Sequence, residues 1–257
     1  MKIKLSQSLF VLALCLAAIS KSSAQDSTVV KNKWHYLAQP YIMSPVINGT
    51  IGLGQLPDAD IHANADDIFS AMQFGAMLYF EAHNDHWALS SDMIYVDLIQ
   101  DAESKRGIIS AEAGTKQLIW EAAGLRRINP WFDAGIGLRL VNMKSSLDMD
   151  VDSALGGGHR SKSITETWVD PIIIGSVKLP AGKRWLFQLR ADVGGFGIGS
   201  DFTWQAQADV GYRLSKLLQL GLSYRILAID YQNGSGDDRF LYNVDMYGPA
   251  LKIGFNF

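Results

Sequence analysis

The feature that most constrains this chain is a set of long segments in which apolar and polar residues alternate. Between Trp185 and Gly194, one face carries Trp, Phe, Leu, Ala and Val, while the other carries Leu, Gln, Arg, Asp and Gly. The same alternation runs from Phe202 to Arg213. Successive side chains of a strand point to opposite faces, so each segment predicts a two-faced β-strand. These segments are about twice as long as the usual globular strand of about 5–6 residues.

The length and the aromatic ends of the segments indicate a membrane environment. A β-strand that crosses a bilayer needs ~9–11 tilted residues. The apolar faces begin and end in aromatic residues such as Trp185 and Tyr212, as in the aromatic girdles of membrane barrels. The opposite face, with its Arg, Asp and Gln residues, would make a poor soluble core. We therefore expect the apolar face to point outward to lipid and the polar face to point into a lumen.

The predicted fold class is all-β: a transmembrane antiparallel up-and-down β-barrel of ten strands, spanning residues 34–257. Short and long connections alternate along the chain, as in outer-membrane barrels with short periplasmic turns. Eight strands is the alternative, if the first segment or the Gly-rich connection at 197–201 is misread. The predicted strands are 36–47, 70–82, 86–97, 108–126, 131–149, 165–179, 184–196, 202–214, 217–231 and 239–257.

Two places depart from the simple pattern. Within 108–126, Glu112 and Lys116 share a face with Leu118 and Trp120, so we expect a β-bulge that resets the phase. Pro171 and Pro249 also lie inside predicted strands, where each removes a ladder donor.

Composition excludes several other classes. The formal net charge of −3 excludes a strongly basic nucleic-acid binder, so no nucleic-acid partner is expected. A hydrophobic content of 48% excludes intrinsic disorder. A soluble secreted barrel of the lipocalin type is the alternative fold, but the face with Trp185, Phe187 and Leu189 would leave a large apolar patch in water.

Residues 1–24 are predicted to be a cleaved signal peptide. Lys2 and Lys4 give a positive start, an uncharged run follows from Leu5 to Ile19, and small residues precede a cut after Ala24. The run is short for a transmembrane helix, which needs ~20 residues. Residues 25–33 are predicted to be a loose periplasmic leader.

Lipid attachment at Cys15 is the alternative interpretation of this segment. Leu14 precedes it, where a lipid-attachment motif has a small residue. Cys15 is the single cysteine. The mature chain is therefore expected to have neither disulfides nor thiolate metal sites.

Charged residues of both signs are predicted to face the lumen. Because neighbouring opposite charges can pair, we expect a structural network of ion pairs that fills a narrow barrel. The alternative is a polar conduit or small-solute pocket, although only barrels of ~16–18 strands leave a wide channel. Unpaired charges in so confined a space would be costly. The predicted luminal residues are Asp133, Arg139, Asp170, Lys178, Arg190, Asp192, Asp209, Arg213 and Arg225.

No cofactor, metal or catalytic residue is predicted. His83 and His86 lie in a predicted tight turn, where side chains three apart need not converge on a metal. No histidine is predicted on an inward strand face beside a serine, as nucleophilic catalysis would require. A lipid-modifying enzyme is the lesser alternative, since His62 and His159 lie in predicted outer loops.

The second half carries distinctive motifs. They are Trp168-Val169-Asp170-Pro171, the run ADVGGFGIGSDFTWQ from Ala191 to Gln205, Gly211-Tyr212-Arg213, and GPALKIGFNF at the end of the chain. This resembles a widespread family of uncharacterised Gram-negative outer-membrane β-barrel proteins with WVDP, ADxGGFGxGSDxTWQ, GYR and terminal GPxxGxxFxF motifs. The resemblance covers about residues 165–257; Ser223 stands where a glycine is expected. It implies an outer-membrane barrel and no activity.

The end of the chain predicts a partner. Phe257 and Phe255 share a face with Ile253 and Leu251, which looks like the terminal strand that the outer-membrane assembly machinery recognises. The expected partners are thus outer-membrane lipid and that machinery, with any small-molecule ligand unknown. The expected role is a non-enzymatic structural or surface-interaction barrel.

Overall fold

The computed structural model describes residues 33–55, 57–103, 109–151 and 158–257, which form one unit. The predicted signal peptide at 1–24, and the leader at 25–33 except for Lys33, lie outside the described residues. The elements are β1 (His35–Met43), β2 (Val46–Leu53), β3 (Ala59–Ala63), α2 (Ala65–Ala71), β4 (Met72–His83), β5 (Trp87–Glu103), β6 (Ile109–Asn129), β7 (Phe132–Val151), β8 (Gly158–Ala181), β9 (Trp185–Gly194), β10 (Phe202–Arg213), β11 (Leu218–Asn233), η1 (Gly236–Asp238) and β12 (Phe240–Asn256).

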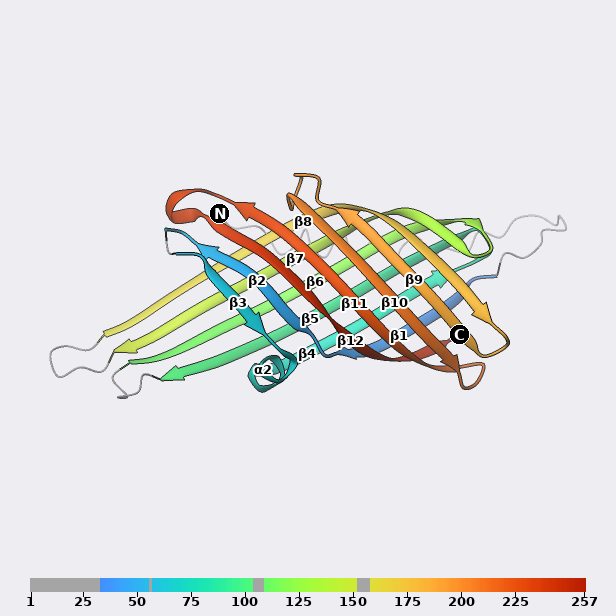
Figure 1. Ribbon diagram of the computed structural model, residues 1–257, viewed down its shortest axis with the longest axis horizontal. Helices are drawn as coiled ribbons and strands as arrows, with labels where there is room; N and C mark the ends of the chain where they lie inside the picture. Colours follow the sequence, from blue (N-terminus) through green and yellow to red (C-terminus); the bar gives the residue numbers. More distant parts are fainter. Residues whose placement is uncertain (1–32, 56, 104–108, 152–157) are drawn as a thin grey trace, which may run out of the picture. The chain divides into compact units, whose positions relative to one another are not determined.

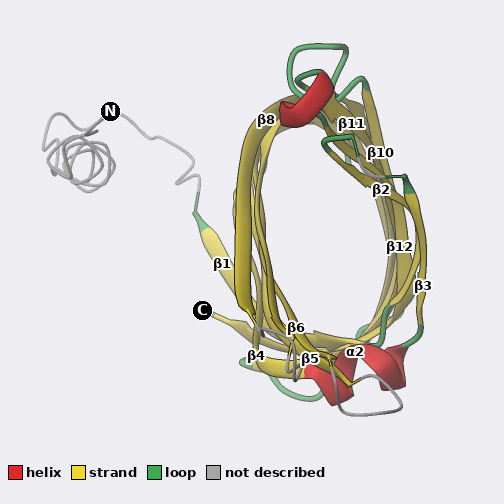
Figure 2. Ribbon diagram, turned by 90° about the vertical axis from the view of Figure 1, so that its left-hand side faces the viewer, coloured by secondary structure: helices red, strands yellow, loops and turns green. Residues whose placement is uncertain are grey.

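β1 and β4 to β12 form a closed antiparallel barrel of ten strands (Figure 1). β1 closes the ring because it pairs with both β4 and β12, and Figure 2 shows the strands as a ring with α2 beside β5. The prediction of ten strands is confirmed, and the alternative of eight is wrong.

The connections form two classes, as predicted. The turns after β4, β6, β8 and β10 are short and lie at one end of the barrel, which we call the short-turn end. The chain enters β1 and leaves β12 at this same end. The opposite end, which holds the longer connections, is called the long-loop end. No described helix is long and apolar enough to span a bilayer.

The first predicted strand, 36–47, is broken in two. β1 ends at Met43 and β2 begins at Val46, because Pro45 has no N–H for a ladder. On the long-loop side of this break, β2 pairs with β12 and with β3. The connection between the predicted strands 36–47 and 70–82 therefore contains β3 and most of α2, which begins with a capping box at Asn64.

Both strand prolines lie where a ladder is interrupted. Pairing between β8 and β9 begins at Ile172. Pro171 therefore lies just outside this ladder, and its lack of an N–H leaves no ladder hydrogen bond unmade. Pro249 lies opposite the break, where its carbonyl accepts a hydrogen bond from the Ser44 N–H at 2.8 Å. Gly248 is required there, since a Cβ would lie 2.1 Å from the Ser44 carbonyl oxygen.

The β-bulge expected within 108–126 is wrong. β6 keeps a continuous register against β5, and the irregularity lies between Arg127 and Asn129, beside the turn. Lys116 and Trp120 point to the same side of β6. Trp120 lies in the outer apolar region, whereas Lys116 lies beyond that region and forms an ion pair with Asp97 at 2.7 Å. One face of a regular strand thus passes through two environments.

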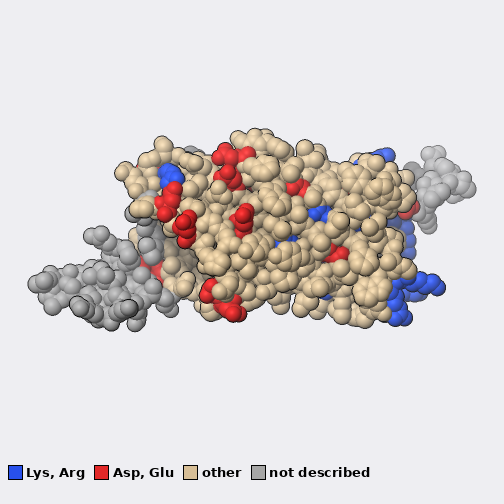
Figure 3. Space-filling view, viewed as in Figure 1, with Lys and Arg blue, Asp and Glu red and all other residues tan. Residues whose placement is uncertain are grey.

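An apolar band surrounds the barrel. Leu189, Ile136 and Leu251 point outward, with 58%, 71% and 68% of their surface exposed. Figure 3 shows a largely uncharged surface, with Lys and Arg residues gathered at the short-turn end. Such a band is the outer surface that a bilayer requires.

Candidate functional site: the barrel lumen

The inward face of the barrel is divided into two layers. The charged layer lies toward the short-turn end, and the apolar layer lies toward the long-loop end. The charged layer comprises Asp92, Glu121, Arg139, Arg190, Asp192, Asp209, Arg225 and Lys252. The apolar layer includes Ile94, Ile119, Val141, Met143, Trp168, Leu227, Ile229, Tyr231, Tyr242 and Val244.

Glu121 is the centre of the charged layer. Its Oε2 accepts a hydrogen bond from Nη2 of Arg139 at 2.9 Å, and its Oε1 pairs with Arg190. Arg139 also donates to Oδ1 of Asp192 at 2.7 Å and to Oγ1 of Thr203 at 3.0 Å. Arg139 is fully buried, so its charge is satisfied entirely by these side chains.

A second group of contacts crosses the lumen. Arg225 on β11 pairs with Asp92 on β5. It also donates to Oε1 of Gln207 at 2.8 Å and to the Tyr41 hydroxyl at 3.0 Å. That hydroxyl donates in turn to Oδ1 of Asp92 at 2.9 Å. These contacts bridge walls that are far apart in the sequence.

A third group closes toward the short-turn end. Nζ of Lys178 lies 2.8 Å from Oε1 of Glu81 and 3.6 Å from Oδ2 of Asp133. Arg127 approaches Asp133 at 3.2 Å, and Nδ1 of His83 lies 3.0 Å from Oε1 of Glu81. The His83 ring therefore lies against this cluster of charges.

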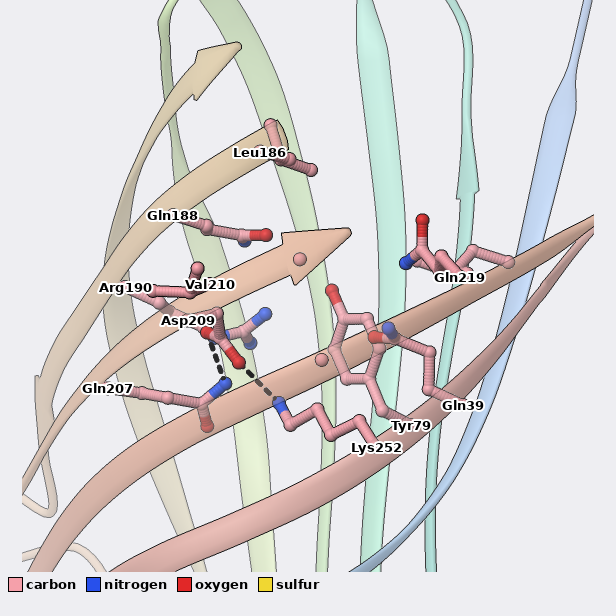
Figure 4. Close-up of a pocket in the computed structure, with 13 residues that line it drawn as sticks. Gln39, Tyr79, Leu186, Gln188, Arg190, Gln207, Asp209, Val210, Gln219 and Lys252 are labelled. Carbon is pink, nitrogen blue, oxygen red and sulfur yellow. Dashed lines mark hydrogen bonds and ion pairs between the residues drawn. The ribbon is translucent and has the colours of Figure 1, made fainter. Parts of the chain in front are cut away.

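A small vestibule lies on the short-turn side of the charged layer (Figure 4). Its volume is about 40 Å³, which is room for a few water molecules at most. Lys252 reaches across it to Oδ1 of Asp209 at 2.7 Å, and Gln207 donates to Oδ2 of Asp209 at 2.8 Å. Its lining is rich in glutamine: Gln39, Gln188, Gln207 and Gln219.

The apolar layer was not expected from the sequence, which predicted a polar lumen throughout. Ile94, Ile119, Val141 and Trp168 are register partners on four successive strands and form a row around the wall. The Trp168 ring stacks on Tyr231 with centroids 3.9 Å apart. Side chains of β8 and β11, which do not pair with each other, therefore meet in this part of the lumen.

Asp170 has a different role from the one predicted. It is fully buried and accepts hydrogen bonds from the Ser200 N–H at 2.6 Å and the Ser200 hydroxyl at 2.8 Å. Gly199 lies so close that a Cβ would come within 2.5 Å of the carboxylate. The WVDP and GGFGIGSD motifs thus meet: the carboxylate of one anchors the loop of the other.

The other predicted luminal residues fall into three groups. Five lie in the charged layer: Arg139, Arg190, Asp192, Asp209 and Arg225. Asp133 and Lys178 belong to the cluster at the short-turn end. Arg213 is exposed at the end of β10, where no ion pair joins it to another described residue.

Sequence reasoning missed several partners. Glu121 was missed because the expected bulge left the phase of β6 undefined; unbroken alternation from an outward-facing Trp120 places it inward. Asp92 and Lys252 lie on the strand faces that alternation predicts to point inward. Tyr41 was missed because it lies within a largely apolar segment. Among the described residues, no three His, Asp or Glu side chains gather as a metal site.

No protein-family model and no curated protein matches the chain. The outer-membrane protease OmpT of Escherichia coli is similar in structure, with a TM-score of 0.54 and 7% identity over 90% of this chain and 99% of that one. Ail, the attachment invasion locus protein of Yersinia pestis, has a TM-score of 0.37 and 12% identity over 87% of this chain and 98% of that one. The P. putida toluene transporter TodX has a TM-score of 0.35 and 7% identity over 87% and 89%. At 7% identity the likeness to OmpT concerns the fold: this chain is a β-barrel of the outer-membrane type.

Proposed function

We propose that this chain is an integral protein of the Gram-negative outer membrane, exported by the signal peptide at 1–24, with a lumen that is closed to solutes. The short-turn end lies in the periplasm and the long-loop end projects outward. The protein acts through its projecting parts and has neither a catalytic site nor a cofactor. It belongs, on this proposal, with the uncharacterised outer-membrane barrels whose motifs it resembles.

The observation that carries the closed lumen is the pairing of charges across it. Glu121 binds two arginines from β7 and β9, and Arg225 joins β11 to Asp92 on β5. These groups occupy the centre of the barrel. Each is paired with an opposite charge, so none of them is free to attract an ion. The apolar layer, on the long-loop side of these groups, adds a second barrier to ions.

The last strand supports the proposed route to the membrane. Phe255 and Phe257 are exposed on the outer face. Phe257 exchanges two backbone hydrogen bonds with Tyr36, at 2.9 and 3.0 Å, and their rings are stacked. We propose that the assembly machinery binds this segment before β1 pairs with it, and that lipid then covers the same aromatic side chains.

Conductance in a planar bilayer tests the closed lumen. The purified protein should show no single-channel steps. Reproducible steps that change in Arg190→Ala or Asp209→Ala would overturn the proposal. Because charges of both signs face inward, a conducting lumen would show weak ion selectivity.

A narrow pore or small-solute binding barrel is the second candidate, and the glutamine-lined vestibule is what favours it. Such a barrel should bind or pass a small polar solute from the short-turn end. Uptake of small sugars and amino acids into proteoliposomes distinguishes the two candidates. Uptake above that of protein-free vesicles, reduced in Gln188→Leu, would favour the second candidate.

A further inference from the structure

The rim of the barrel at the short-turn end is basic. Among the described residues there, Asp85 is the one exposed acidic side chain, and Figure 3 shows Lys and Arg residues gathered at this end. None of the exposed cations of this rim forms an ion pair with another described residue. These cations are Lys33, Arg126, Lys183, Arg184, Arg213 and Lys216. The rim therefore carries free positive charge, in contrast to the paired charges of the lumen.

Two of these arginines lie on aromatic rings of the outer face. Cζ of Arg126 lies 5.1 Å from the centre of the ring of Trp87, its register partner on β5. Cζ of Arg184 lies 6.0 Å from the centre of the Tyr212 ring, and its Nη1 donates to the Tyr212 hydroxyl at 2.9 Å. Guanidinium groups are attracted to aromatic faces in this way. The rings thus hold both charges on the outside of the barrel.

The rings also set the depth of these two charges. Trp185 packs edge-on against Tyr212, with ring centroids 4.8 Å apart, and both Trp87 and Trp185 are half exposed on the outer face. Leu89 and Phe187 follow these tryptophans along β5 and β9 toward the middle of the apolar band. Tryptophan and tyrosine favour the boundary between hydrocarbon and water. The two guanidinium groups therefore lie at the depth of lipid headgroups.

Lipid phosphate matches the donors that these arginines leave free. The guanidinium of Arg126 makes no hydrogen bond to a described residue, and that of Arg184 donates to Tyr212 alone among them. A guanidinium presents its N–H groups as a planar fork that binds two oxygens of one phosphate. Both arginines therefore have such a fork directed at the layer in which lipid phosphates lie.

The charge of the rim selects among phospholipids. A zwitterionic headgroup adds an ammonium to its phosphate, and the rim offers that ammonium several cations and only Asp85 as an exposed acidic side chain. An anionic headgroup brings the phosphate without the ammonium. We propose that Arg126 and Arg184 bind the phosphate groups of anionic phospholipids at the short-turn end of the barrel. This goes beyond the proposed function and requires only that a bilayer surrounds the apolar band.

Site-specific photocrosslinking identifies the lipid beside each arginine. Ile128 and Leu214 are exposed and follow Arg126 and Tyr212 by two positions. A photoreactive benzoylphenylalanine replaces one of them in the purified protein, which is reconstituted into vesicles of equal phosphatidylglycerol and phosphatidylcholine. The adduct masses should show phosphatidylglycerol enriched about fivefold, the gain expected of one cation at an anionic surface. Equal adducts of the two lipids at both positions would overturn the inference.

The two arginine sites serve as controls for each other. From β6 to β9 is three strand spacings, or about 14 Å, which exceeds the ~8 Å over which charges act at physiological salt. Arg126→Gln should therefore abolish the enrichment at position 128 and leave that at position 214. Arg184→Gln should do the reverse. Both arginines are exposed, so neither variant removes a buried contact.

Arg213→Gln is the matched control for charge alone. Arg213 is an exposed cation of the same rim, but its register partner Gln219 lines the vestibule, which places it on the lumen side of β10. Arg213→Gln should leave the enrichment at both positions unchanged. A loss as large as that in Arg126→Gln or Arg184→Gln would overturn a site built on the outer rings.

A photoreactive residue in the middle of the apolar band is the control for position. Ile136 is 71% exposed on the outer face of β7. A benzoylphenylalanine in its place should form adducts in the ratio of the two lipids in the vesicle. Enrichment of phosphatidylglycerol there equal to that at position 128 would overturn the placement of the site at the rim.

Two further outcomes separate this inference from other interpretations. If the detergent-solubilised protein bound purified cell-wall sacculi through Arg126 and Arg184, while the vesicles showed no lipid preference, an anionic polymer would replace the lipid and overturn the inference. Conductance through a planar bilayer would overturn the closed lumen of the proposed function and leave the lipid site intact. Equal lipid adducts without conductance would overturn only the lipid site.

Discussion

The two layers of the lumen are built on opposite principles. On β11, Arg225 faces inward where the outward neighbours Leu222 and Tyr224 are apolar and exposed. Four to six residues further, Ile229 and Tyr231 face inward while Asp230 and Gln232 face outward. Along β11, the inward face is therefore polar where the outward face is apolar, and apolar where the outward face is polar.

This inversion follows from the surroundings of each layer. Where water surrounds the strands, burying apolar side chains in the lumen stabilises the fold by ~25 cal/mol per Å². Where lipid surrounds them, an apolar lumen gains little, since lipid is as apolar as the core. Paired charges and hydrogen bonds then hold the walls together. The transition lies near Trp168 and Asp170, neighbours on β8 that face the same interior.

The largest effect is expected at the centre of the charged layer. Glu121→Ala leaves Arg139 and Arg190 with an uncompensated buried charge, and removing one partner of a buried pair costs ~3–5 kcal/mol. The free energy of unfolding in urea from lipid vesicles measures this loss. A loss below ~1 kcal/mol, smaller than the usual cost of leaving a buried polar group unpaired, would show that water reaches these groups.

Truncation in the apolar layer is expected to cost somewhat less. Leu227→Ala should destabilise the barrel by ~2–4 kcal/mol, because it opens a cavity in a packed interior. Leu222→Ala, on the outer face of the same strand, is the matched control and should cost less, since lipid fills the space. Equal losses would contradict a packed apolar layer.

A paired replacement tests whether charge is needed for stability in the charged layer. Asp209→Leu with Lys252→Met should differ from the unaltered protein by less than the ~3–5 kcal/mol expected of either single variant, because an apolar pair often replaces a buried ion pair without loss. Urea unfolding of the three variants measures the coupling. Additive losses would show that the two charges do not stabilise each other and would contradict this prediction.

The smallest effect concerns a pair outside the lumen. Arg239 donates to both oxygens of Asp58, at 2.6 and 3.0 Å, and these hydrogen bonds lower the pKa of Asp58 below its ordinary 3.8. The contribution of ionised Asp58 to the stability of the fold is complete above the ordinary pKa. It is lost as the pH falls through the lowered pKa of the folded state. The difference in melting temperature between the unaltered protein and Asp58→Asn should thus be constant from pH 7 to 5 and shrink toward pH 3.

Most of the barrel was predictable because strand alternation is a local property. The short turns and the number of strands followed from where alternation stops and restarts. The separate strand β2 and its partner β3 did not, because β2 pairs with β12, nearly two hundred residues away. The phase of β6 was misjudged because a single face passes from lipid to water.

Local alternation in the chain was sufficient to establish an outward apolar band, an inward polar face and ten strands, since each residue's side is set by its neighbours. Which charges pair was decided only when the ring closed. Glu121 meets Arg190, and Arg225 meets Asp92, across 69 and 133 residues of sequence. The apolar layer likewise appears only in the tertiary structure, because strand pairing brings Ile94, Ile119, Val141 and Trp168 into one row.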